Sequence, residues 1–272
     1  MPKFDNHTLV LGAHGSEAAA DSNAPVEALV QQIEKLDLFA KVTPAYLMGQ
    51  PNMDRVLDVA PTENVVVPLM TSSGYYLNSV IPKKLASNDG AENRQWFIKP
   101  VAGMHPRIAP MMIDQVTDRL AEHEIKQSET TIVLIGHGTR RNQLSGKSTF
   151  DLFEKFKTAF PNARNRVAFL DQDPEAPLVA ASILEGHTIV VPFLISRGPH
   201  TTVDVPEAFS LPAGPDVQFP IVAEKKTRSG VQKTVCEMPL ACYPGMLEIV
   251  VGLAENAVEN RQLLSLPELE AV

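Results

Sequence analysis

Short runs of apolar, largely β-branched residues alternate along the chain with longer amphipathic segments. Four runs predict strands that are buried on both faces, namely residues 8–11, 65–69, 131–135 and 188–194. Helical periodicity predicts helices over residues 25–36, 106–122, 147–160 and 245–260. Strand–helix–strand alternation predicts an α/β fold with a mainly parallel central sheet flanked by helices, joined by right-handed crossovers.

The same motifs occur twice in the same order. His14 in Leu-Gly-Ala-His-Gly-Ser and His137 in Leu-Ile-Gly-His-Gly-Thr are 123 residues apart. Gly74 and Gly198, which follow two Val-Val-Pro runs, are 124 residues apart. A third pair of segments lies between these anchors, at residues 42–51 and 166–174. Agreement of the offsets within one residue predicts two similar α/β lobes.

The repeat sets the expected domain bounds. We expect a first lobe over residues 1–126, a second over 127–262 and a surface tail over 263–272. Pro82 and Pro100 in the first lobe are 18 residues apart, whereas Pro206 and Pro239 in the second are 33 apart. The second lobe therefore carries about 15 extra residues, around 211–235.

Composition narrows the class of protein. With 44% hydrophobic residues the chain is expected to fold around a sizeable core. A net charge of −8 without a long basic run argues against nucleic-acid binding. No apolar stretch approaches the roughly 18 residues of a membrane span, and two cysteines are too few for a disulfide framework. We expect a cytoplasmic protein with no membrane partner, either a monomer or a homodimer.

Three polar side chains of the second lobe follow predicted strands. They are His137, Asp171 and His200. In parallel sheets, ligands bind beyond the carboxyl ends of the strands, where all three residues fall. Two imidazoles and a carboxylate suit a first-row divalent cation. The competing interpretation is that each histidine only caps a loop or bonds a carbonyl group.

The first lobe differs at the corresponding positions. His14 is present, but Tyr76 stands where the second lobe has His200, and Met48 stands where it has Asp171. A phenol and a thioether do not replace an imidazole and a carboxylate as ligands of a hard or borderline cation. We expect His14 and Tyr76 to mark a vestigial site and the second lobe to carry the activity.

Cationic side chains cluster near the second-lobe histidines in an otherwise acidic chain. Arg140 and Arg141 follow His137, and Ser196 and Arg197 precede His200. Arginine binds carboxylates bidentately, so the cluster predicts a substrate-binding site for an anion. The alternative is a solvated loop that leads into a helix. The chain lacks a nucleophile elbow, a phosphate-binding loop and a dinucleotide fingerprint, and we expect no tightly bound cofactor.

Three segments resemble the class II chelatases. They are Gly-His-Gly-Thr-Arg-Arg-Asn from Gly136, Phe-Leu-Asp ending at Asp171, and Gly-Pro-His-Thr-Thr-Val-Asp-Val-Pro from Gly198. That family includes the two-lobed sirohydrochlorin cobaltochelatases and ferrochelatases of cobalamin and sirohaem synthesis. The resemblance extends over nearly the whole chain and implies two chelatase-like lobes.

The resemblance also implies roles for individual residues. His137 and His200 become metal-site and catalytic residues, with Asp171 as an acidic ligand or proton acceptor. The family more often has glutamate at the acidic position, which leaves Asp173 and Glu175 as alternatives. The implied substrates are a divalent metal, Co²⁺, Fe²⁺ or Ni²⁺, and a tetrapyrrole whose carboxylates the arginines bind.

The function implied by the resemblance is insertion of cobalt or iron into sirohydrochlorin or a related tetrapyrrole by a lyase that needs no ATP. The alternative is a carrier that binds a tetrapyrrole or metal without catalysis. Phosphoryl transfer through His137 is disfavoured because no arginine directly precedes this histidine.

Overall fold

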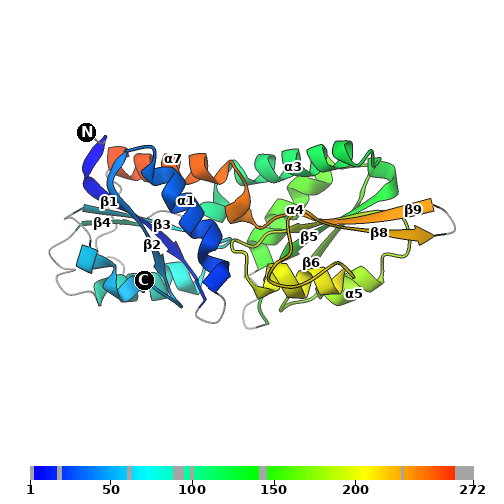
Figure 1. Ribbon diagram of the computed structural model, residues 1–272, viewed down its shortest axis with the longest axis horizontal. Coiled ribbons are helices and arrows are strands. Elements are labelled where there is room, and N and C mark those ends of the chain that lie inside the picture. The colour runs from blue at the N-terminus through cyan, green and yellow to red at the C-terminus, as the bar shows by residue number, and fades with distance from the viewer. Residues whose placement is uncertain are drawn as a thin grey trace. The chain divides into compact units, whose positions relative to one another are not determined.

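A computed structural model describes residues 3–16, 20–59, 63–87, 95–98, 101–140, 146–227 and 230–260. The chain forms two compact units, one from residues 1–105 with 241–272 and the other from residues 106–240 (Figure 1). Each unit has one sheet with helices packed against it, which confirms the predicted α/β class. No helix in the described ranges is long and apolar enough to cross a membrane.

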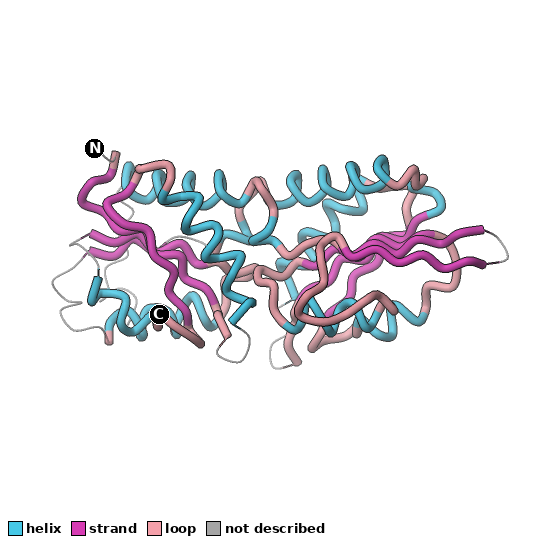
Figure 2. The backbone as a smooth tube through the Cα atoms, viewed as in Figure 1, coloured by secondary structure: helices cyan, strands magenta, loops and turns pink. Residues whose placement is uncertain are grey.

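The sheet of the first unit has the order β2-β1-β3-β4, with all neighbours parallel. Figure 2 shows the strands of both sheets in magenta, with helices in cyan beside them. Its strands are β1 (Phe4–Ala13), β2 (Phe39–Tyr46), β3 (Glu63–Pro68) and β4 (Gln95–Ile98). The central strands β1 and β3 are buried on both faces where they pair, as continuous apolar runs predict.

The sheet of the second unit has the order β6-β5-β7-β9-β8. Its strands are β5 (Thr130–Gly136), β6 (Arg164–Phe169), β7 (His187–Pro192), β8 (Ile221–Thr227) and β9 (Gly230–Cys236). The first four positions repeat the order of the other sheet, which confirms the prediction of two similar lobes. The extra segment of the second repeat supplies β8, which pairs antiparallel with β9.

The last helix of each sequence repeat lies in the unit built mainly by the other repeat. The helices are α1 (Ala24–Glu34), α2 (Ile81–Ala86), α3 (Ile108–Glu122), α4 (Lys147–Ala159), α5 (Ala176–Ala181), α6 (Val205–Ala208) and α7 (Met246–Asn260). Helix α3 packs against α4, whereas α7 packs against β3, β4 and α1. The compact units therefore differ from the sequence repeats 1–126 and 127–262. The predicted tail, 263–272, lies outside the described residues.

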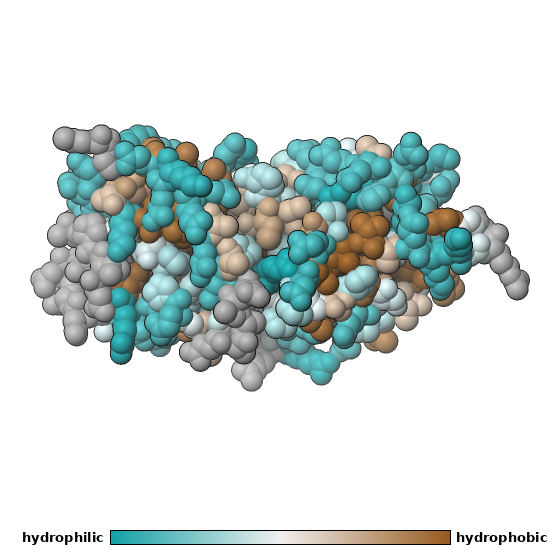
Figure 3. Space-filling view, in the orientation of Figure 1, coloured by the Kyte–Doolittle hydropathy of each residue, from teal (hydrophilic) through white to brown (hydrophobic). Residues whose placement is uncertain are grey.

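Helix α3 is amphipathic. Ile108, Met112, Val116 and Leu120 recur every four residues and are buried. Hydrophilic side chains cover the outer surface of the helix in the view of Figure 3. The apolar stripe therefore attaches α3 to the second unit.

A buried ion pair also holds α3 in place. Nε of Arg119 on α3 donates to Oε1 of Glu237, directly after β9, over 2.7 Å. Glu237 is fully buried and Arg119 is 6% exposed. Burial raises the pKa of the Glu237 carboxyl above its usual value, and the Arg119 guanidinium opposes that rise. Removal of Arg119 would leave the Glu237 carboxylate buried without this partner, and removal of Glu237 would leave Arg119 with only the exposed carboxylate of Glu122.

We expect Glu237→Gln to lower the free energy of unfolding by about 3 kcal/mol, because the buried Arg119 then keeps only the exposed carboxylate of Glu122 as a counter-charge. Urea denaturation followed by circular dichroism measures this change. Glu122→Gln is the matched control, since Glu122 bonds the same guanidinium with a side chain that is 60% exposed. That variant should lose less than about 1 kcal/mol. Equal losses in the two variants would contradict this account of the buried pair.

Candidate active site

The two His-Gly turns have the same local geometry. Gly15 and Gly138 have φ of 71° and 70°, in the left-handed region that favours glycine. A Cβ atom at Gly138 would lie 2.6 Å from the Cβ atom of Gln172, which also requires glycine here. The carbonyl of His14 accepts from the backbone N–H of Met48 over 2.8 Å. The His137 carbonyl accepts from the N–H of Asp171 over 2.9 Å, so each turn is attached to the neighbouring strand end.

A compact turn after β7 carries the second histidine. The turn leads into a short π-helix, His200–Asp204. The single proton of the Thr201 hydroxyl is shared between the carbonyl oxygens of Ser196 and Gly198, and the hydroxyl oxygen accepts from the Gly198 N–H, over 3.0–3.1 Å. The Thr202 hydroxyl donates to the same Gly198 carbonyl over 3.1 Å. These bonds fix the backbone that positions His200. The Ser196 carbonyl oxygen takes part as an acceptor.

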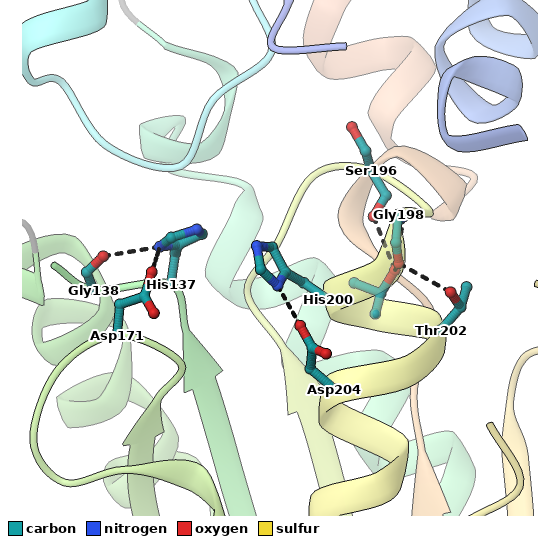
Figure 4. A network of polar contacts seen from close by, with 9 residues as sticks. His137, Gly138, Asp171, Ser196, Gly198, His200, Thr202 and Asp204 are labelled. Carbon is teal, nitrogen blue, oxygen red and sulfur yellow. Dashed lines mark hydrogen bonds and ion pairs between the residues drawn. The ribbon is translucent and has the colours of Figure 1, made fainter. Parts of the chain in front are cut away.

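The imidazoles of His137 and His200 face each other (Figure 4). Their ring centroids are 5.0 Å apart and the ring planes are nearly perpendicular, at 89°. Nδ1 of His137 bonds the Gly138 carbonyl over 2.9 Å, and Nδ1 of His200 bonds Oδ2 of Asp204 over 2.6 Å. In the neutral rings these bonds place the proton on Nδ1 and leave the Nε2 lone pair available as a ligand. Both side chains are about half exposed, at 48% and 49%.

Asp204 is a further candidate site residue, to which the sequence analysis assigned no role. It lies four residues after His200, so both side chains project from the same face of the helical turn. A carboxylate that bonds Nδ1 fixes the tautomer and orientation of a metal-binding imidazole and increases its basicity. The four-residue spacing within the motif from Gly198 was the available signal.

Asp171 lies beside His137, but on the Nδ1 side of the ring. Its Oδ2 is 3.6 Å from Nδ1 of His137, and its side chain is 59% exposed. Of the alternatives, Glu175 pairs with Arg140 over 2.5 Å and Asp173 is exposed. In the described ranges, no group of three or more His, Cys, Asp or Glu is placed to hold a metal ion. A ligand role for Asp171 therefore stays a prediction.

The first repeat has the same frame with different side chains. His14 and Tyr76 form an edge-to-face pair with centroids 5.5 Å apart at 83°, and Nδ1 of His14 is 3.1 Å from the Gly15 carbonyl. Tyr76 starts a π-helix, Tyr76–Val80, as His200 does. Val80 stands where the second repeat has Asp204, and Met48 stands where it has Asp171. The counterparts of an imidazole and two carboxylates are thus a phenol, an isopropyl group and a thioether.

The predicted arginines have different surroundings. Arg140 has a side chain that is 78% exposed and bonds Glu175. Nη2 of Arg197 donates to the carbonyls of Pro215 and Val217 over 2.6 Å each, so this residue fastens the segment that precedes β8. Arg141 lies outside the described residues. Substrate contacts of all three arginines stay predictions.

We expect Asp204→Asn to weaken Co²⁺ binding about 10- to 100-fold, because the amide cannot hold the Nδ1 proton of His200 as a carboxylate does. Isothermal titration with Co²⁺ in the absence of tetrapyrrole measures the affinity. Asp151→Asn is the matched control, since Asp151 forms an exposed pair four residues from Lys147 on α4. Unchanged affinity in Asp204→Asn would exclude the orienting role.

The sequence of the chain is similar to proteins of one family. The sequence profile of the CbiX family matches residues 8–119 and again 131–257. A probable sirohydrochlorin cobaltochelatase of Halobacterium salinarum is 26% identical over 221 residues, which cover 73% of this chain and 75% of that protein.

Two solved structures show a similar fold. SirB from Bacillus subtilis with Fe³⁺ has a TM-score of 0.71 at 13% identity, with 96% of this chain and all of that chain covered. A multi-domain Deinococcus radiodurans protein described as structurally similar to chelatases has a TM-score of 0.68 at 19% identity over 91% of this chain. The present chain spans only 54% of that protein.

Proposed function

The chain belongs to the CbiX family, with two copies of the family repeat, and on this basis we propose that it inserts a divalent metal ion into sirohydrochlorin or a related tetrapyrrole. The observation that carries the proposal is the pair of facing imidazoles in the second repeat, each with Nδ1 already bonded. Two nitrogen ligands on a half-exposed surface give a weak metal site with open coordination positions.

Metal insertion exchanges two pyrrole protons for one divalent cation. The metal must therefore leave its protein ligands as it forms bonds to the macrocycle nitrogens, and two protons must be accepted. Nε2 of His137 and His200 becomes free as the metal departs, and a neutral imidazole nitrogen can then accept a proton. Asp171, 3.6 Å from Nδ1 of His137, stabilises the resulting imidazolium.

Arg140 is the described cation best placed for substrate binding. It follows the His137 turn closely, and its side chain is 78% exposed even though it bonds Glu175. A tetrapyrrole carboxylate can replace that glutamate as the partner, because carboxylates bind guanidinium groups bidentately. The two N–H groups of Arg197 that bond loop carbonyls leave the rest of its guanidinium for the same purpose.

The metal is proposed to be cobalt or iron. Imidazole ligands accept Co²⁺, Fe²⁺ and Ni²⁺, so availability contributes to the choice as well as geometry. The Halobacterium relative is named a cobaltochelatase, and SirB was solved with Fe³⁺. We favour cobalt because the relative with that name aligns over three quarters of its own length.

The test follows sirohydrochlorin absorbance over time with Co²⁺ or Fe²⁺, with and without protein. We expect His137→Ala and His200→Ala each to slow insertion at least about tenfold, equivalent to about 1.4 kcal/mol of barrier. His14→Ala should lose much less, because Tyr76 replaces the partner imidazole in that repeat. Circular dichroism establishes that each variant is folded.

Two outcomes would overturn the proposal. Binding of sirohydrochlorin without faster insertion would favour a carrier. Equal losses from His14→Ala and His137→Ala would show that insertion does not depend specifically on the second-repeat pair.

A further inference from the structure

Large apolar side chains are exposed at the carboxyl edge of the first sheet. Met48 follows β2 and is 51% exposed, Tyr75 and Tyr76 follow β3 and are 72% and 44% exposed, and Met104 follows β4 and is 50% exposed. Carboxyl ends of parallel strands meet at one edge of a sheet, so these loops lie at the same edge. We call Met48, Tyr75, Tyr76 and Met104 the strand-end platform.

Backbone hydrogen bonds join the strand-end loops in two pairs, and the edge-to-face contact of His14 with Tyr76 links the two pairs. The N–H of Met48 donates to the His14 carbonyl over 2.8 Å. The N–H of Gly103, beside Met104, donates to the carbonyl of Met70 in the loop after β3 over 2.9 Å. The loops therefore form one connected surface, and the exposed side chains are not isolated residues on unrelated parts of the unit.

The rings of the platform leave their faces accessible. Tyr75 and Tyr76 are 6.1 Å apart at 61°, and Tyr76 meets His14 edge to face at 83°. Neither pair is stacked, so a flat π-system can pack on the rings from solvent. None of the four platform side chains carries a charge, whereas the second repeat has Asp171 and His200 in place of Met48 and Tyr76.

We infer that the strand-end platform is a binding site for the flat face of a conjugated macrocycle, the substrate of the proposed function, on which this inference rests. An exposed cluster of aromatic and thioether groups at a strand-end ligand position is typical of a binding surface for an apolar partner. A planar ring matches unstacked tyrosines, and flexible methionine side chains adapt to its outline. The first repeat thus supplies an apolar surface for the ring.

The test measures the affinity of metal-free sirohydrochlorin by absorbance titration and, separately, the affinity of Co²⁺ by calorimetry. We expect the double variant Tyr75→Ala/Tyr76→Ala to bind sirohydrochlorin at least tenfold more weakly and Co²⁺ as the unaltered protein does. Tyr75→Phe/Tyr76→Phe should keep most of the affinity, because the rings remain and only the hydroxyl groups are lost.

Leu178→Ala/Leu184→Ala is the matched control. Both leucines are exposed, at 66% and 85%, and belong to the second unit, whereas the platform residues belong to the first. This variant removes comparable exposed apolar surface and should bind sirohydrochlorin normally. An equal loss of affinity in the control would overturn the inference, since it would show a non-specific effect of exposed surface.

The other outcomes separate this inference from the proposed function. If the unaltered protein inserts metal and the Tyr→Ala double variant binds sirohydrochlorin normally, the platform is not a macrocycle site although the proposed function holds. If the unaltered protein binds sirohydrochlorin without inserting metal, and the double variant loses that binding, the platform assignment holds and the proposed function fails. If the Tyr75→Ala/Tyr76→Ala variant sediments differently from the unaltered protein but binds sirohydrochlorin with the same affinity, the platform is instead a contact between copies of the chain.

Discussion

The hydrogen bonds at Nδ1 of His137 and His200 determine which nitrogen of each ring can serve as a ligand. Each neutral imidazole has one nitrogen that donates and one that accepts, so a bond at Nδ1 decides which atom can ligate a metal. The Gly138 carbonyl and the Asp204 carboxylate take the Nδ1 positions, at 2.9 Å and 2.6 Å. The Nδ1 atoms therefore hold each ring to its own loop. Both Nε2 atoms remain available as weak nitrogen ligands.

The two copies of the repeat carry different side chains on the same backbone frame. The His-Gly turn, the carbonyl bond to the neighbouring strand end and the π-helix after the third strand occur in both copies. The copies differ in the side chains on that frame, with Tyr76, Val80 and Met48 in one and His200, Asp204 and Asp171 in the other. The two copies therefore share a backbone frame at the strand ends, on which the first copy carries exposed apolar side chains and the second carries imidazole and carboxylate groups.

Local patterns in the sequence predicted the features that local forces decide. Continuous apolar runs gave the buried strands, and two matched offsets gave the common strand order. The pairing of His137 with His200 was also predictable, since both follow adjacent parallel strands. The exchange of α3 and α7 between units was not, because the apolar stripe of a helix does not specify which sheet it covers. The hydrogen bonds from Arg197 to the carbonyls of Pro215 and Val217 were not predictable either. They depend on how the inserted segment folds, and that segment contains no recognisable motif.

In the proposed function the second repeat alone binds the metal, through His137 and His200. Calorimetric titration of Co²⁺ into the unaltered protein, His14→Ala and His137→Ala/His200→Ala tests this directly. We expect one ion per chain in the first two proteins and no specific binding in the third. Two ions per chain, or one ion that disappears in His14→Ala and remains in the double variant, would contradict it.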